Sequence, residues 1–227
     1  MIMASTVYRQ RSQRDPSRNA IDPENRFLWR KPIQRLEAEI VRDRILATSG
    51  ELNHQMHGPP VSVRADDVGQ IVVAAGVAGM RRSVYVQVRR TMPVSMLRQF
   101  DMPDIKVNCE KRATSTVAPQ SLTLMNSSFI LEQAEAFARR LQREAGSDLE
   151  PQVRWAWQYA FARQPTEREL ARGLTFLAGQ VAYLEARDAA VTGDQEAKEP
   201  SGLPAPLQAL TSLCQVLMGS SEFLYSD

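Results

Sequence analysis

The chain has 227 residues, of which 43% are hydrophobic and 24% are charged, and this composition is ordinary for a globular protein. A chain of this length buries on the order of 70% of its extended surface on folding, so it forms a core without a disulfide or a metal. Its apolar runs fall short of the ~20 residues of a membrane span, and the opening MIMASTVYRQRSQR lacks the apolar stretch of a signal peptide.

Charge is unevenly distributed along the chain. Residues 1–115 carry 19 Lys+Arg against 12 Asp+Glu, and residues 116–227 carry 9 against 14, so the two halves differ in sign although the total is +2. Arginine supplies 24 of the 28 basic residues, which suits bidentate pairing with carboxylates but also follows from a GC-rich genome. We therefore expect ion pairs between the two halves.

Two helices are predicted before residue 50. Asp22 and Pro23 are typical of a helix start, which predicts a helix in DPENRFLW. A second helix is predicted from Pro32 to the stop signal Gly50. Its apolar face is assigned to Ile33, Leu36, Ile40 and Val41, and its solvated face to Gln34, Arg35, Glu39, Arg42 and Asp43.

A small two-stranded β element is predicted at about residues 70–90. The preceding ELNHQMHGPP interrupts regular structure, because its glycine and two prolines do not continue a helix. The predicted strands are QIVVAAGV (70–77) and SVYVQV (83–88), and PVSMLRQF is predicted as a short helix after them.

The C-terminal half is predicted to be helical. Four segments carry apolar residues at helical spacing, and the third begins with a capping box of Thr166 and Glu169. The predicted fold class is therefore mainly α. Its parts are a main helical domain over residues 1–187 that includes the β element, a flexible linker over 188–204, and a C-terminal helix over 205–227 that packs back on the main domain.

The stretch RRSVYVQVRR (81–90) is the first candidate for a binding function. As a strand it would direct Val84, Val86 and Val88 into the core. Nucleic-acid binding of useful strength neutralises roughly 6–10 phosphates, whereas the four arginines here alternate in facing. Internal pairing with acidic groups or helix-end carbonyls is therefore favoured, and no nucleic-acid partner is expected. On this interpretation, replacing Arg82 or Arg90 by alanine destabilises the fold.

Histidine and cysteine patterns predict no metal or cofactor. His54 and His57 flank Met56, as copper or haem-iron ligands do, but no nearby Asp, Glu or Cys completes a ligand set. Cys109 and Cys214 do not form a metal-binding or redox pair, and they fit one disulfide as well as two free thiols.

Serine and carboxylate patterns also lack parts that catalysis needs. Ser121 and Ser127 have no histidine base in their segment and no G-x-S-x-G elbow. The carboxylate pair Asp101 and Asp104 lacks a surrounding apolar stretch that would raise one of the two pKa values.

Four blocks of the sequence together resemble a known domain. In chain order they are NRFLWRKPIQRLEAEIVRDRILATSGELN, RRSVYVQVRRTMPVSMLRQFDMPD, NCEKRATSTVAPQSLTLMNSSFILEQAEAFARRL and LCQVLMGSSEFLYSD. They resemble the planctomycete-specific C-terminal domain of unknown function found in large exported proteins. The resemblance implies an extracytoplasmic parent protein, with a planctomycete-type cytochrome c domain among the domains that are its partners. Because the chain has neither a signal peptide nor a C-x-x-C-H haem attachment, we expect either a truncated form or a stand-alone remnant.

The family has no established activity, so the resemblance supplies no catalytic residues. Its blocks contain the candidate ligand-binding or structural residues Arg81, Arg82, Tyr85, Arg89, Arg90, Asp101, Asp104 and Arg112. They also contain Phe100, Pro103, Cys109, Ser115, Thr116, Pro119, Gln120 and Asn126.

Two functions are compatible with these residues. The main hypothesis is a non-catalytic interaction or scaffolding module of an exported multidomain protein. The alternative is a hydrolase or carbohydrate-processing domain in which Asp101, Asp104 and the arginines line one cleft. A pocket with shifted pKa values would favour the alternative, whereas arginines that are already paired would favour the module.

Overall fold

The computed structural model describes residues 1–104, 109–110, 112–191 and 202–226, and it is mainly helical with a small antiparallel β element, which confirms the predicted fold class. The helices are α1 (Pro16–Ile21), α2 (Ala38–Ser49), α3 (Ser95–Gln99), α4 (Ala118–Asn126), α5 (Ser128–Ala145), α6 (Leu149–Phe161), α7 (Glu167–Val191), α8 (Ala205–Met218) and α9 (Ser221–Leu224). The 3-10 helices are η1 (Ile2–Ala4), η2 (Val77–Met80) and η3 (Ser83–Tyr85), and the strands are β1 (Gln34–Arg35), β2 (Val63–Ala65), β3 (Ile71–Val73) and β4 (Tyr225–Ser226). None of the described helices is long and apolar enough to cross a lipid bilayer.

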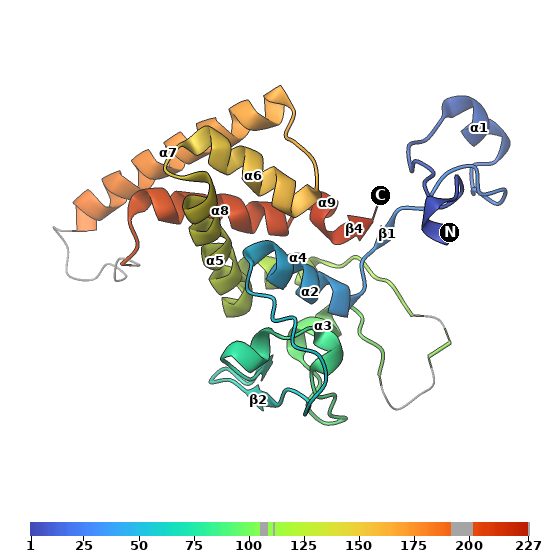
Figure 1. Cartoon of the computed structure of the whole chain (residues 1–227), viewed down its shortest axis with the longest axis horizontal. Coiled ribbons are helices and arrows are strands. Elements are labelled where there is room, and N and C mark those ends of the chain that lie inside the picture. The colour runs from blue at the N-terminus through green and yellow to red at the C-terminus, as the bar shows by residue number, and fades with distance from the viewer. Residues whose placement is uncertain (105–108, 111, 192–201, 227) are drawn as a thin grey trace.

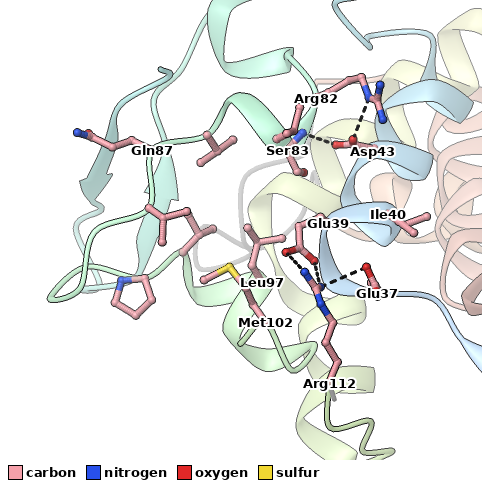
Figure 2. Close-up of a pocket in the computed structure, with 15 residues that line it drawn as sticks. Glu37, Glu39, Ile40, Asp43, Arg82, Ser83, Gln87, Leu97, Met102 and Arg112 are labelled. Atoms are coloured by element: carbon pink, nitrogen blue, oxygen red, sulfur yellow. Dashed lines mark hydrogen bonds and ion pairs between the residues drawn. The ribbon is translucent and has the colours of Figure 1, made fainter. Parts of the chain in front are cut away.

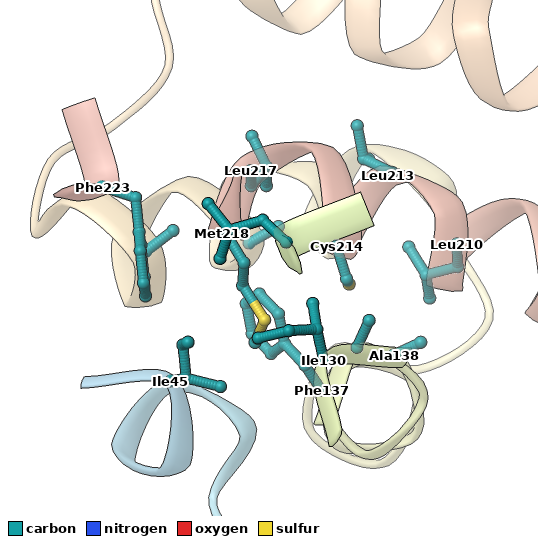
Figure 3. Packing of buried hydrophobic residues seen from close by; sticks show 14 of the residues in the cluster. Ile45, Ile130, Phe137, Ala138, Leu210, Leu213, Cys214, Leu217, Met218 and Phe223 are labelled. Atoms are coloured by element: carbon teal, nitrogen blue, oxygen red, sulfur yellow. The ribbon is translucent and has the colours of Figure 1, made fainter. Parts of the chain in front are cut away.

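The core forms around α5, which packs against α2, α6 and α8, while α7 covers α8 (Figure 1). Figure 3 shows Ile45 of α2 and Met218 of α8 meeting Phe137 of α5, and all three are fully buried. The apolar stripes predicted for α5 and α8 are confirmed, because all of their residues are buried: Ile130, Ala134, Phe137 and Leu141 in α5, and Leu207, Leu210, Cys214 and Leu217 in α8. Burying a large apolar side chain contributes roughly 1.5–3 kcal/mol, so the many buried residues of this helical layer stabilise the fold strongly.

The β element differs in its second strand from the prediction. β3 pairs antiparallel with β2, with Val63 opposite Val73, and not with residues 83–88. The hairpin turns at Asp66, whose carboxylate accepts the main-chain N–H groups of Val68 (3.1 Å) and Gln70 (2.7 Å). This side chain fixes a tight turn at a position that hydrophobic alternation does not reveal.

Residues 83–88 were wrongly predicted as a strand. Residues 83–85 form η3, and of the three valines expected in the core only Val86 is buried, where it bridges to Val61. Val84 is 74% exposed and Val88 is 53% exposed. The chain curls here because the Asp43 carboxylate accepts the Ser83 N–H at 2.6 Å, which replaces a strand ladder with a side-chain bond from α2.

The helix predicted in DPENRFLW is wrong, because residues 22–29 form turns that follow α1, and α1 itself was not predicted. Asp15, not Asp22, caps α1 by accepting the Arg18 N–H at 3.0 Å. α2 begins at Ala38 rather than Pro32, because Gln34 and Arg35 pair with β4 at the other end of the chain. The predicted stop is confirmed, since Gly50 closes α2 with a left-handed φ of 85°.

The C-terminal half contains the four predicted helices and the capping box. Thr166 and Glu169 exchange hydrogen bonds at the start of α7, as a capping box does. One helix of this half, α4, was not predicted. α7 continues to Val191, and residues 192–201 of the linker expected over 188–204 lie outside the described part. The domain boundaries remain a prediction. The two cysteines are not bonded to each other, since Cys109 is exposed and Cys214 is buried in α8.

Candidate functional site

A cleft of about 330 Å³ lies between α2, residues 82–88 and α3, and it contains two of the candidate residues, Arg82 and Arg112 (Figure 2). Its apolar side includes Val86, Leu97 and Met102. Its polar rim carries the carboxylates of Glu37, Glu39 and Asp43. The cleft is therefore the place where the described chain brings the predicted arginines together with acidic groups.

The charged groups of the cleft bind one another. Both terminal nitrogens of Arg112 donate to Glu39, at 2.7 and 3.2 Å, and one of them lies 3.3 Å from Glu37. The hydrogen bond with Glu39 raises the pKa of Arg112. Asp43 lies 3.6 Å from Nε of Arg82. These pairs leave the rim with polar groups that are already engaged, which is unlike an acid–base site awaiting a substrate.

Arg81 is buried next to the cleft and fastens the preceding loop. Its guanidinium donates to the main-chain carbonyls of Gln55 (3.2 Å) and Pro59 (3.0 Å) and to that of His57. It also lies 4.1 Å from the ring centroid of Tyr85, whose hydroxyl accepts the His57 N–H. The two histidines considered as metal ligands are thus part of a loop held by main-chain bonds. Among the residues that the structure describes, no three His, Cys, Asp or Glu side chains gather as metal ligands do.

Arg42 was assigned to the solvated face of α2, and this assignment is wrong. Its side chain is buried and donates to the carbonyls of Gly79 (2.6 Å) and Arg81 (3.0 Å) and to the Ser83 hydroxyl (3.2 Å). Burial lowers the pKa of Arg42 to about 10, although Asp43 partly opposes the effect. Position 79 must be a glycine, because the Cβ of any other residue would lie 1.9 Å from the main-chain carbonyl oxygen of Ala74.

The remaining arginines of the stretch 81–90 lie at the surface. The Arg82 side chain is 61% exposed, Arg89 and Arg90 are exposed, and Arg89 donates to the amide oxygen of Gln87 at 3.0 Å. Replacing Arg82 or Arg90 is therefore no longer expected to destabilise the fold, because exposed ion pairs contribute little. Within this stretch the buried arginine is Arg81, which packs beside the buried Arg42 of α2.

Asp101 belongs to a second cluster, beside a cavity of about 410 Å³. Its carboxylate accepts from Arg35 at 2.6 Å and from the N–H and hydroxyl of Ser115. The Gln120 amide donates to the carbonyls of Gln99 (3.0 Å) and Ser115 (3.3 Å). Asp104 is exposed. Asp101 is thus bound to Arg35 of β1 and not to the arginines at 81–90.

Arg35 is the residue of this cluster that the sequence interpretation missed. The helix predicted from Pro32 placed Arg35 on a solvated face, but β1 turns its side chain inward, and only 3% of that side chain is exposed. All the residues of this cluster stand in the family blocks quoted above, with Arg35 in the first, Asp101 in the second, and Ser115 and Gln120 in the third. No local pattern showed that these positions meet.

Two carboxylates whose pKa is lowered in the folded protein, Asp101 and Glu169 of the α7 capping box, lead us to expect a loss of stability in acid. Burial raises the pKa of Asp101, but the hydrogen bonds from Ser115 and the charge of Arg35 outweigh it, so the pKa lies below its ordinary value. The hydrogen bond from Arg163 likewise lowers the pKa of Glu169. A carboxylate whose pKa is lower in the folded state stabilises the protein above its unfolded pKa, and this contribution is lost as the pH falls through the folded pKa.

We expect the free energy of unfolding, measured by urea titration, to fall progressively below about pH 5. In Asp101→Asn it should be lower at neutral pH and fall less steeply in acid, because the group that gains a proton is gone. The exposed Asp67→Asn is the matched control and should follow the wild-type curve. Parallel acid curves for wild type and Asp101→Asn would contradict the prediction.

Comparison with known protein families identifies a family for most of the chain. Residues 1–177 match the model of a family described as PSD1, protein of unknown function (DUF1553). No curated protein and no solved structure matches the chain.

Proposed function

Because this chain belongs to the PSD1 family of proteins of unknown function (DUF1553), we propose that it acts by binding, as a non-catalytic interaction module of a larger exported planctomycete protein that also carries a cytochrome c domain. The observation that carries the proposal is the pairing of the cleft's charged groups. Arg112 is bound by Glu37 and Glu39, and Asp43 by Ser83 and Arg82. A general acid or base must exchange protons with a substrate, whereas these groups hold one another.

The hydrolase alternative gains no support from the described residues. It requires a carboxylic acid with a raised pKa, and the pKa of Asp101 is lowered. It also requires Asp101 and the arginines at 81–90 to share one cleft, but Asp101 is bound by Arg35 and Ser115.

The cleft has the character of a docking surface for an apolar segment. Its apolar side continues to Val84 and Val88, both well exposed, while paired charges form the rim. Interfaces commonly combine an apolar centre with a polar rim. We propose that the occupant is an extended apolar segment of another domain of the parent protein, which agrees with the extracytoplasmic multidomain context that the sequence blocks imply.

Substitutions in the cleft test this binding role. Val84→Asp is expected to abolish the binding of this chain to apolar peptides in an overlapping array that covers the rest of the parent polypeptide, and Val88→Asp to weaken it. Both side chains are exposed, so the melting temperature should not change. The matched control is Val68→Asp on the hairpin turn, where the valine is 80% exposed. Product release from glycoside or ester substrates that disappears in Asp101→Asn would overturn the non-catalytic role.

The cellular context is tested by an antibody blot of source-cell fractions that is also stained for covalent haem. We expect an extracytoplasmic band that is larger than 25.5 kDa and stains for haem. A haem-free band of 25.5 kDa in the cytoplasm would contradict the proposed export and the proposed cytochrome c partner.

A further inference from the structure

The first 33 residues form an arm, here called the N-terminal arm, that stands apart from the helical body and joins it through β1 (Figure 1). Large apolar side chains are exposed all along it: Ile2, Met3, Val7, Tyr8, Ile21, Phe27, Leu28 and Ile33. A contiguous set of exposed apolar residues marks an interaction surface more often than single exposed residues do.

The tip of the arm is built to hold its apolar residues outward. The buried Asp22 carboxylate accepts the N–H groups of Arg26 (2.9 Å) and Phe27 (2.8 Å), and the Asn25 side chain bonds both main-chain groups of Arg30. Asn25 and Leu28 adopt left-handed φ values of 56° and 54°. Phe27 remains 82% exposed at this fixed turn. Backbone strain held by specific bonds at an exposed apolar turn indicates a preorganised contact rather than a loose end.

The arm also carries an excess of positive charge. It has seven basic and three acidic residues, a net charge of +4. Among the described residues, the Arg11, Arg14 and Arg26 side chains make no hydrogen bond or ion pair, in contrast to the buried arginines of the body. Two buried polar atoms without a partner, Oδ1 of Asn19 and Nε of Arg30, also lie in the arm. The arm thus has unused binding capacity, which fits an apolar surface with acidic groups around it.

The chain itself presents such a surface at the start of α6. A hollow of about 880 Å³ there is lined by Asp148, Glu150, Arg154 and Trp155, among others, and no residue of the arm in the same chain lines it. Trp155 is 42% exposed and stacks on Tyr159, which fixes its ring. Arg154 pairs with Glu150 at 2.8 Å and lies 4.0 Å from the almost fully exposed Glu167. With Asp148, the carboxylates in and beside the hollow therefore outnumber its arginine.

We infer that the N-terminal arm of one copy of this chain docks in the α6 hollow of a second copy, so that two copies exchange arms in a closed two-fold dimer. Phe27 packs on Trp155, and Arg26 faces Asp148 and Glu150. The complementarity of charge supports this occupant, because the arm has a net charge of +4 while residues 116–227 carry 9 basic against 14 acidic residues. Reciprocal exchange closes the assembly at two copies and leaves no free arm.

Sedimentation equilibrium of the purified chain tests the inference. Wild-type protein is expected to shift from 25.5 kDa toward twice that mass as its concentration rises, and to dissociate in high salt. Phe27→Asp should weaken dimerisation by about tenfold or more, because it places a charge at the centre of the contact. Met56→Asp, which alters another exposed apolar side chain on the body, is the matched control and should leave the dimer unchanged.

Charge-reversal variants distinguish the specific contact from non-specific association. Arg26→Glu and Glu150→Arg should each weaken the dimer, and the double variant should restore it. A monomer at every concentration overturns the inference, as does a dimer that Phe27→Asp leaves intact. A monomer that binds anionic phosphatidylserine vesicles through Phe27 would assign the arm to a lipid surface and would also overturn it. None of these outcomes bears on the proposed cleft function, which involves α2 and α3.

Discussion

Arg35→Ala is expected to lower the free energy of unfolding by about 3–5 kcal/mol, because it removes one member of a largely buried ion pair. Arg35 donates to the carbonyls of Phe100 (3.1 Å) and Ser115 (3.2 Å) as well as to the Asp101 carboxylate. Its guanidinium also lies 5.4 Å from the ring centroid of Phe100. Without it, Ser115 is the remaining partner of the Asp101 carboxylate among the described residues, and the Asp101 side chain is only 22% exposed. Urea denaturation followed by circular dichroism measures the loss.

Two further variants test the cause of this loss. Arg90→Ala, at an exposed arginine, should change stability by less than about 0.5 kcal/mol. The double variant Arg35→Met/Asp101→Asn should be more stable than Arg35→Ala, because neither partner is then left charged. A double variant that is as unstable as Arg35→Ala would show that the shape of the arginine, rather than its charge, stabilises the site.

Phe137→Ala is expected to destabilise the protein by about 3–5 kcal/mol, because the surrounding helices cannot close the cavity that it leaves. Phe137 is fully buried at the centre of α5, between α2 and α8 (Figure 3). Its ring also meets Tyr159 of α6 edge to face, with centroids 6.3 Å apart. The substitution therefore weakens three helix contacts at once, and thermal unfolding should show a large fall in the melting temperature.

The control for this prediction is Tyr183→Ala on α7, where the aromatic ring is 63% exposed. It should leave the melting temperature nearly unchanged. Phe137→Leu should lie between the two, since it removes less volume. If Tyr183→Ala were as destabilising as Phe137→Ala, the core would not be centred on α5.

Half-buried arginines of α2 and α5 share one role in this fold. Arg140 donates to the carbonyls of Ala47 and Thr48 at the end of α2, and Arg44 donates to that of Ala160 at the end of α6. The last carbonyls of a helix have no partner within the helix and carry partial negative charge, so a guanidinium stabilises them. These arginines thus serve helix ends of the body, whereas Arg82, Arg89 and Arg90 lie at its surface.

The sequence predicted the helices best where the apolar spacing was regular over several turns. α5, α6, α7 and α8 all follow the predicted stripes, because each buries one face and the 3.6-residue period records that face. The short elements were predicted poorly. β1 is two residues long and owes its existence to β4, at the opposite end of the chain. No local pattern carries such a pairing.

The sequence by itself therefore determined the mainly α class, the long helices, the Gly50 stop and the Thr166–Glu169 capping box, because these depend on residues within a few turns of one another. Only the tertiary structure decided which arginines are structural. Arg35 and Arg42 were assigned to solvent, and their partners lie 37 to 80 residues further along the chain. The local sequence around an exposed arginine does not differ from that around a buried, hydrogen-bonded one. The role of an arginine is set by whether folding brings unpaired carbonyls and carboxylates to it.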